Sequence, residues 1–292
     1  MGAIEVKNIT MYYGKVCALE NVSLTFHRNE IYGLLGRNGA GKTTLLNLIT
    51  NRLFPTRGEV TIDGEPIGEN DHVLGKIFYM TEQNLYPEEK TVKSIFQWTK
   101  EFYPSFDMEY ALALCDKFAL DPRKKIKSLS TGYNTISKII TTLATNAEIL
   151  LFDEPILGMD AYHRDLFYKE LLASYIKKPK TIILSTHIIE EISDILERVV
   201  ILKEKQIAVH APVEDLLKRA YCVSGGADGV ERYIAGKKCI NLDQMTSYKA
   251  ATILGEASEE DRMAAKELKL EISKVELQKL FIYLTNTGGG EK

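Results

Sequence analysis

The sequence lacks several features that would each indicate a particular class of protein. Its 292 residues include only four cysteines, which lie far apart and form no CxxC pair: Cys17, Cys115, Cys222 and Cys239. This spacing gives no indication of a zinc site and predicts reduced thiols in a cytosolic protein. No apolar run reaches the roughly 18 residues of a membrane-spanning helix, and the first residues lack the apolar segment of a signal peptide. A role at a membrane would therefore require another protein to hold this chain there.

An excess of positive charge is also missing. The chain has 37 basic and 40 acidic side chains, a formal net charge of -3. Such a balance provides no global positive field for a polyanion, so we expect no nucleic-acid partner. The length allows one large domain or two modest ones, either of which can bury a substantial core.

The N-terminal part, residues 1–84, has the periodicity of strands. Apolar and polar residues alternate over the first 35 positions, with turns expected at Gly14 and Asn29, and end in the apolar run IYGLL of a buried central strand. Asp63-Gly64 predicts a hairpin turn. Residues 85–130 are rich in aromatic side chains and favour an inserted helical lobe.

Strands and helices alternate again in residues 131–217. The apolar strands EILLF and TIILS flank a helix expected near residues 160–174, and a second helix is expected over 188–197. This alternation predicts an α/β fold with a largely parallel sheet covered on both faces.

Residues 218–286 change to short strands and helices, which predicts a small α+β subdomain at the C-terminus. Two stretches have the pattern of a helix-capping box, one from Ser258 to Asp261 and one from Ser273 to Glu276. The tail, residues 287–292, is expected to be disordered.

A glycine-rich segment between an apolar strand and a helix carries the first chemical signal. GRNGAGKT satisfies G-x-x-x-x-G-K-[ST], a pattern that average residue usage produces by chance about once in a hundred chains of this length. Its backbone N–H groups can surround phosphate oxygens, Lys42 can reach the β and γ phosphates, and Thr43 can contact Mg²⁺. The segment predicts a phosphate-binding site made of Gly36, Arg37, Asn38, Gly39, Ala40, Gly41, Lys42, Thr43 and Thr44.

An acidic pair follows the apolar strand of ILLFDEP. At the carboxyl edge of a parallel sheet, beside the phosphate loop, Asp153 can hold Mg²⁺ through the metal's water shell. Glu154 can then polarise an attacking water molecule. The pair therefore predicts hydrolysis of the bound nucleotide.

Together, these motifs resemble the ATP-binding subunit of ABC (ATP-binding cassette) transporters. The resemblance covers residues 1 to about 215, and the C-terminal piece resembles the extension of bacterial drug- and peptide-export ATPases. It implies a P-loop NTPase fold, ATP and Mg²⁺ as ligands, and ATP hydrolysis coupled to transport. The implied partners are an integral-membrane permease and a second ATPase subunit, with this chain at the inner face of the cell membrane.

The same resemblance assigns roles to residues that carry little signal alone. LSTGY, residues 129–133, stands where such proteins carry LSGGQ, so Ser130 and Gly132 would close over the γ-phosphate held by a second subunit. Thr131 and Tyr133 depart from that pattern and bear on the choice of partner. By the same match, His187 would contact the γ-phosphate and Asp160 would lie at the dimer seam. Tyr13 would stack on adenine, and Val16 could complete that surface.

The sequence leaves one site residue undecided between Glu82 and Gln83. Relatives carry a glutamine loop that connects Mg²⁺ and water to the membrane subunit. Spacing from Tyr79 selects Glu82, whereas Gln83 offers the usual neutral side chain, and either one could contribute to the metal site.

Alternatives to a transporter subunit are a soluble ABC-type ATPase in translation or DNA repair and a regulatory module without turnover. Translation factors of this type usually carry two cassettes in one chain, and repair ATPases insert a long coiled coil, neither of which is present here. The resemblance to export ATPases implies export, whereas the sequence leaves the cargo and the choice between homo- and heterodimer open.

Overall fold

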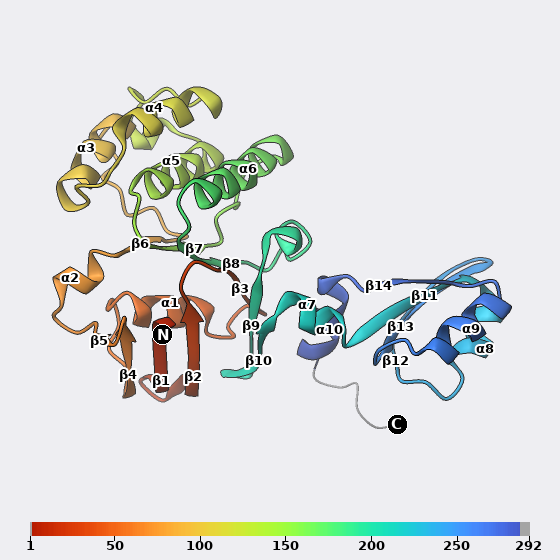
Figure 1. Ribbon diagram of the computed structural model, residues 1–292. Helices are drawn as coiled ribbons and strands as arrows, with labels where there is room; N and C mark the ends of the chain where they lie inside the picture. The colour runs from red at the N-terminus through yellow and green to blue at the C-terminus, as the bar shows by residue number, and fades with distance from the viewer. Residues whose placement is uncertain (1, 287–292) are drawn as a thin grey trace. The chain divides into compact units, whose positions relative to one another are not determined.

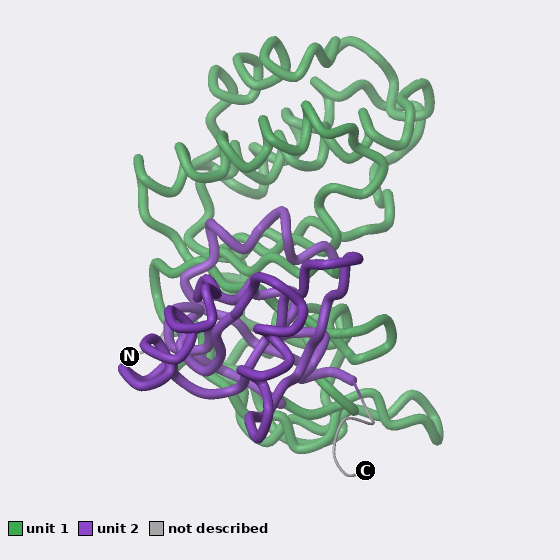
Figure 2. The backbone as a smooth tube through the Cα atoms, turned by 90° about the vertical axis from the view of Figure 1, so that its right-hand side faces the viewer, with its two compact units in different colours: residues 1–187, 202–207 green, residues 188–201, 208–292 purple. Residues whose placement is uncertain are grey.

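The computed structural model describes residues 2–286, and its backbone forms two compact units (Figure 2). The first unit runs to His187 and also includes Leu202–Ile207, whereas the second includes Ile188–Ile201 and continues from Ala208. The predicted subdivision into a core, a helical subdomain and a C-terminal subdomain stays a prediction. The tail expected to be disordered, residues 287–292, lies outside the described residues.

An antiparallel sheet forms the N-terminal part of the first unit. Its strand order is β2-β1-β4-β5, with β1 (Gly2–Tyr13), β2 (Val16–His27), β4 (Arg57–Ile62) and β5 (Glu65–Pro66). Gly14 at the first turn has φ 60°, and the Asp63-Gly64 hairpin has φ 55° and 83°. These left-handed conformations match the turn types that join antiparallel strands closely. The predicted turns are therefore confirmed.

A parallel sheet positions the chemically interesting residues. Its strands lie side by side in the order β3 (Ile31–Gly36), β8 (Thr181–Ser185), β7 (Ile149–Asp153) and β6 (Ile77–Met80). Every residue of β3, β7 and β8 is buried, as their uninterrupted apolar runs predict. Because the strands are parallel, their carboxyl ends meet at one edge, which confirms the predicted α/β architecture.

Six α-helices belong to the described part of the first unit. They are α1 (Lys42–Ile49), α2 (Asp71–Leu74), α3 (Val92–Phe102), α4 (Met108–Lys117), α5 (Thr131–Ala144) and α6 (Ala161–Lys177). Helices α3 to α6 lie together in Figure 1. Helix α5 is the most deeply buried of these, because Ile136, Ile139, Ile140 and Leu143 recur at helical spacing on one face. Helix α6 confirms the helix expected near residues 160–174.

The prediction of a helix over residues 188–197 is wrong. The segment forms only a short 3-10 helix, Ser193–Ile195, before β9 (Arg198–Lys203) and β10 (Gln206–Pro212). Its four β-branched isoleucines lower the helix propensity only slightly, as the isoleucine-rich helix α5 shows, so tertiary packing decides the conformation of this segment. Ile189 and Ile192 are buried although they are not part of an α-helix, which explains why their spacing in the sequence resembles that of a helix.

The second unit contains a strand-helix-strand-strand-helix-strand arrangement. Its elements are β11 (Ala220–Gly226), α8 (Ala227–Ile234), β12 (Cys239–Met245), β13 (Tyr248–Leu254), α9 (Glu259–Glu267) and β14 (Glu271–Lys274). The strands pair antiparallel in the order β12-β13-β11-β14, which is the ferredoxin-like topology. Helices α7 (Val213–Leu217) and α10 (Leu277–Thr285) flank this arrangement in the sequence.

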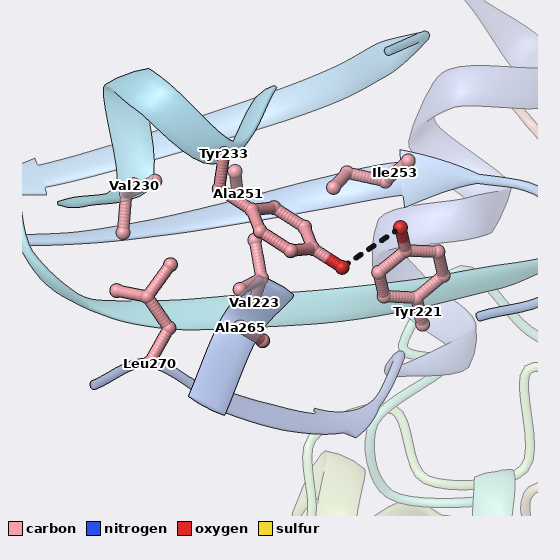
Figure 3. Packing of buried hydrophobic residues seen from close by; sticks show 8 residues of the cluster. All are labelled: Tyr221, Val223, Val230, Tyr233, Ala251, Ile253, Ala265 and Leu270. Carbon is pink, nitrogen blue, oxygen red and sulfur yellow. Dashed lines mark hydrogen bonds between the residues drawn. The ribbon is translucent and has the colours of Figure 1, made fainter. Parts of the chain in front are cut away.

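Apolar side chains from the sheet and both helices form the core of this unit (Figure 3). Val223 and Ala251 on the two central strands face Val230 of α8 and Ala265 of α9. The hydroxyls of Tyr221 and Tyr233 lie 3.3 Å apart, and Tyr233 also donates to the Asp261 carbonyl at 3.1 Å. These bonds satisfy polar atoms that burial would otherwise leave unpaired.

The two capping boxes expected in this unit have different outcomes. Ser258 and Asp261 form a complete box at the start of α9, with both reciprocal hydrogen bonds present. The box expected from Ser273 to Glu276 is wrong, because Ser273 lies within β14 and pairs with Cys222 of β11. Helix α10 therefore begins four residues later, at Leu277, without a side-chain cap.

The four cysteines are free thiols, as predicted. Within residues 2–286, no helix combines the length and the apolarity needed to cross a membrane.

Candidate active site

The glycine-rich segment forms the connection from β3 to α1. Gly39 and Gly41 have φ 79° and 106°, in the left-handed region that favours glycine. A Cβ atom on Gly41 would lie 2.5 Å from Leu19 Cδ2 and 2.9 Å from the Ala18 carbonyl oxygen, so the site has no room for a side chain. Gly41 is also the N-cap of α1, whose free N–H groups and dipole favour an anion.

Lys42 is the first residue of α1, and its ammonium group lies within the same loop. Nζ donates a hydrogen bond of 2.7 Å to the Gly36 carbonyl, and the side chain is buried. Burial lowers the pKa of Lys42, whereas the carboxylates of Glu154 and Asp153 act in the opposite direction. A cation is thus held beside the helix N-terminus, which is suitable for binding phosphate.

Asp153 ends strand β7 and is 1% exposed. Its Oδ2 accepts hydrogen bonds from the Thr43 hydroxyl at 2.7 Å and the Tyr79 hydroxyl at 3.2 Å. Burial and the nearby Asp153 carboxylate raise the pKa of Tyr79, which stays a hydrogen-bond donor. The other oxygen, Oδ1, is buried and has no partner among the described residues. A buried carboxylate oxygen without a partner is costly, so this atom is suited to bind a metal ion or an ordered water molecule.

The donors around this oxygen fit Mg²⁺. Asp153 and Thr43 provide hard oxygen ligands side by side, 2.7 Å apart. Mg²⁺ usually takes one or two protein oxygens and completes its shell with phosphates and water. The donor set is therefore of the type that binds Mg²⁺ together with a nucleotide.

Glu154 departs from the strand direction immediately after Asp153. Its φ of 49° is unusual for a residue other than glycine, and its N–H donates to the Ser185 carbonyl at 2.8 Å. Its Oε2 lies 2.9 Å from His187 Nδ1 and 3.3 Å from the Thr186 hydroxyl. The left-handed backbone therefore turns Glu154 toward His187 and away from the bonds of Asp153.

A cavity of about 480 Å³ connects these groups. It lies where the carboxyl ends of β3 and β7 meet the start of α1, the expected place for a ligand of a parallel sheet. Its lining residues are Ala18, Asn38, Gly39, Ala40, Gly41, Lys42, Thr43, Thr44, Glu82, Asp153, Glu154, Leu157 and His187.

The remaining candidate residues lie outside this lining. Gly36 and Arg37 precede the lining part of the loop, and Tyr13 and Val16 are exposed and paired across the β1–β2 turn. Of the two candidates for the glutamine-loop residue, Glu82 lines the cavity and Gln83 does not, which favours Glu82.

Ser130 and Asp160 each cap a helix outside the cavity. Ser130 accepts a hydrogen bond from the Tyr133 N–H at the start of α5, and Asp160 accepts one from the His163 N–H at the start of α6. Hydrogen bonds from His163 lower the pKa of Asp160. A Cβ atom on Gly132 would lie 2.6 Å from the Gly158 carbonyl oxygen, so Gly132 allows the two helix starts to approach closely. These residues are available for a contact outside their own cavity.

Further residues of the site were not predicted from the sequence. Ala18 and Leu157 line the cavity, Thr186 hydrogen-bonds Glu154, and Tyr79 hydrogen-bonds Asp153. Their residue types carry no chemical signal, although Thr186 could have been found because it lies between strand β8 and His187.

Comparisons with known proteins agree with this geometry. The ABC transporter family matches residues 19–157. The ABC transporter ATP-binding protein YtrB of Bacillus subtilis is 28% identical over 283 residues, which is 96% of this chain and 97% of the relative. An uncharacterized ABC transporter ATP-binding protein of Methanocaldococcus jannaschii is 32% identical over 222 residues, 74% of this chain and 80% of its own length.

A solved structure leads to the same result. An ATP-binding cassette determined as a dimer with ADP and phosphate bound is 26% identical, with a TM-score of 0.64, and covers 72% of this chain and 98% of its own. The fold and the site therefore define a P-loop ATPase. The chain belongs to the family of ABC transporter ATP-binding proteins, and it is an ATP-binding and ATP-hydrolysing subunit.

Proposed function

We propose that this subunit powers a separate integral-membrane permease, that it works as one of a pair of ATPase subunits, and that transport is outward. One observation carries the hydrolytic part of the proposal. The cavity brings the hydrogen-bonded Glu154–His187 pair beside Lys42, Thr43 and Asp153, so groups for phosphate binding and for water activation face the same space.

Each group has a chemical role in this proposal. The N–H groups of the glycine-rich loop and Lys42 bind the β and γ phosphates of ATP. Glu154 accepts a proton from a water molecule while the oxygen of that water molecule attacks the γ-phosphorus. The bond from that phosphorus to the bridging oxygen breaks, and ADP leaves with the bond's electron pair. His187 orients Glu154 through Nδ1, which leaves Nε2 to contact the γ-phosphate.

Thr43 and Asp153, with Glu82, would hold Mg²⁺. When bound, this ion neutralises charge on the β and γ phosphates. The buried hydrogen bond from Thr43 to Asp153 fixes the direction of both oxygens before the ion arrives.

The second ATPase subunit would complete the site. Ser130, Gly132 and Asp160 lie outside their own cavity, and Ser130 starts a 14-residue helix whose N-terminus favours an anion. In a head-to-tail pair, this helix would close over the nucleotide of the partner subunit, and Tyr13 and Val16 would contact the adenine.

Support for a transport role comes from the relatives. Those described above are named as ABC transporter proteins, which favours transport over the alternative of translation or DNA repair. One further relative, from Burkholderia lata, is named as a Nod factor export ATP-binding protein, which favours export. A separate permease would hold this chain at the inner face of the cell membrane.

Copurification tests this proposal. The chain is tagged in its native cell, extracted with detergent from the membrane fraction, and its companions are identified and quantified. We expect a multi-spanning protein in near-equal amount, dependent on the tagged chain. Recovery with ribosomes, with DNA or with no partner would overturn the transporter assignment.

A further inference from the structure

Helix α5 carries a lysine on its buried face. Lys138 lies eight residues after Ser130, about two turns along the helix, and its side chain is 7% exposed. Lysine is rarely buried at this level unless its ammonium group has partners. Its position two turns from Ser130 raises the question of what it binds.

The ammonium group of Lys138 binds two consecutive backbone carbonyls. Nζ donates to the Thr81 oxygen at 2.9 Å and to the Glu82 oxygen at 2.7 Å. Both carbonyls belong to the loop that leaves strand β6 and brings Glu82 to the nucleotide cavity. Bonds from an ammonium donor are stronger than those between neutral groups, so they restrain the start of this loop.

A second contact fixes the other end of the same loop to the same helix. The hydroxyl of Tyr86 hydrogen-bonds with Thr141, three residues after Lys138, and burial raises the pKa of Tyr86 to about 12. Helix α5 thus holds residues 81–86 at both ends.

We propose that Lys138 is a positioning residue that fixes the Glu82 loop to helix α5. The helix that presents Ser130 to a second subunit thereby also holds Glu82 at the cavity of its own subunit. A displacement of α5 when two subunits close moves Glu82 with it. This inference rests on the proposed role of Glu82 and goes beyond it by naming the group that sets the position of the loop.

Three variants test the inference. Lys138→Met keeps the length of the side chain and removes the donors, whereas Lys138→Arg keeps the donors. Thr142→Val is the matched control, because Thr142 is also buried, lies one turn further along the helix, and donates its hydroxyl to the Lys138 carbonyl and not to the loop. If Lys138→Met does not fold, Lys138→Gln replaces it, because glutamine has a shorter side chain that ends in an uncharged amide.

Amide hydrogen exchange of nucleotide-free protein is the first measurement. Residues 81–86 should exchange about tenfold faster in Lys138→Met, since one hydrogen bond to a charged group typically changes an equilibrium by that factor or more. Lys138→Arg should restore most of the protection, and Thr142→Val should leave it unchanged. Equal exchange in Lys138→Met and the wild type, or equal acceleration in Thr142→Val, would overturn the inference.

ATP hydrolysis at varied Mg²⁺ is the second measurement. Lys138→Met should raise the half-saturating Mg²⁺ concentration about tenfold and change the KM for ATP at saturating Mg²⁺ by less than about threefold. An unchanged Mg²⁺ dependence would contradict the proposed link to Glu82. A wild type that hydrolyses no faster than Glu154→Gln would instead contradict the proposed function, and hydrogen exchange alone would then decide the role of Lys138.

Discussion

At the scale of single residues, the two neighbouring acidic side chains have separate surroundings. Asp153 lies among buried hydroxyls, whereas Glu154, one position later, binds the half-exposed His187. The left-handed backbone at Glu154 gives the two carboxylates different partners, so that one position can hold a metal while the other accepts a proton.

Lys180 allows a test of how burial affects stability. The residue is 2% exposed, its ammonium group donates to the Ser174 hydroxyl at 2.9 Å, and burial lowers its pKa to about 8. Between about pH 8 and the unfolded value near 10.4, the unfolded chain binds a proton that the folded chain has released. The free energy of unfolding therefore rises with pH in this window, and the cost of burying the charge is fully present below it.

We expect Lys180→Met to increase the free energy of unfolding at pH 7 by about 1–3 kcal/mol. The difference from the wild type should shrink as the pH rises toward 10. Urea unfolding at pH 7, 9 and 10 measures both effects. A variant that is less stable at pH 7, or a difference that does not change with pH, would contradict this account.

Gly132 allows a test of the close approach between two loops. In Gly132→Ala, the new Cβ atom would meet the Gly158 carbonyl at 2.6 Å, so the start of α5 must shift. We expect the rate of ATP hydrolysis to fall at least about tenfold while ATP binding to the single subunit changes little, because the cavity lies elsewhere. Gly68→Ala is the control, since its Cβ atom would meet nothing within 4 Å. Equal rates for the two variants would show that the contact is unimportant.

At the scale of elements, the sequence predicted those features that depend on local pattern. Uninterrupted apolar runs identified β3, β7 and β8, and Asp63-Gly64 identified a hairpin. The box expected at Ser273 failed because pairing with β11 overrides a local capping pattern, and only the folded chain reveals that pairing.

The residues of the candidate site likewise include some that a local sequence pattern predicts and some that it does not. The glycine-rich loop and the acidic pair were recognisable because phosphate and metal chemistry restricts their residue types and spacing. Lys138 was not, because a lysine in an apolar helix carries no sign of its partners. Its two carbonyl partners are 56 and 57 residues away in the sequence.

The confirmed capping box allows a test of a single element. We expect Ser258→Ala to destabilise α9 by about 1 kcal/mol, which corresponds to roughly fivefold faster hydrogen exchange over residues 259–267. ATP hydrolysis should be unchanged, since Ser258 belongs to the second unit and the cavity to the first. Unchanged exchange over α9 would contradict the role of the cap.

At the scale of the whole molecule, the proposed site needs two subunits. The cavity holds Lys42 and Glu154, whereas Ser130 lies outside it at the start of α5. We expect Glu154→Gln to form a dimer with ATP and Mg²⁺ in size-exclusion chromatography, because bound ATP is no longer hydrolysed. Ser130→Ala in the same background should weaken this dimer. A Glu154→Gln protein that stays monomeric would indicate a different subunit as the natural partner.

The most direct test of the central claim compares ATP hydrolysis by the wild type and Glu154→Gln, each purified with its companion from the membrane. Loss of a general base typically costs about 10²–10⁴-fold in rate. We predict that the wild type is at least about a hundredfold faster, while both proteins bind ATP equally well. Equal rates would contradict the account, because the pair formed by Glu154 and His187 would then have no part in hydrolysis.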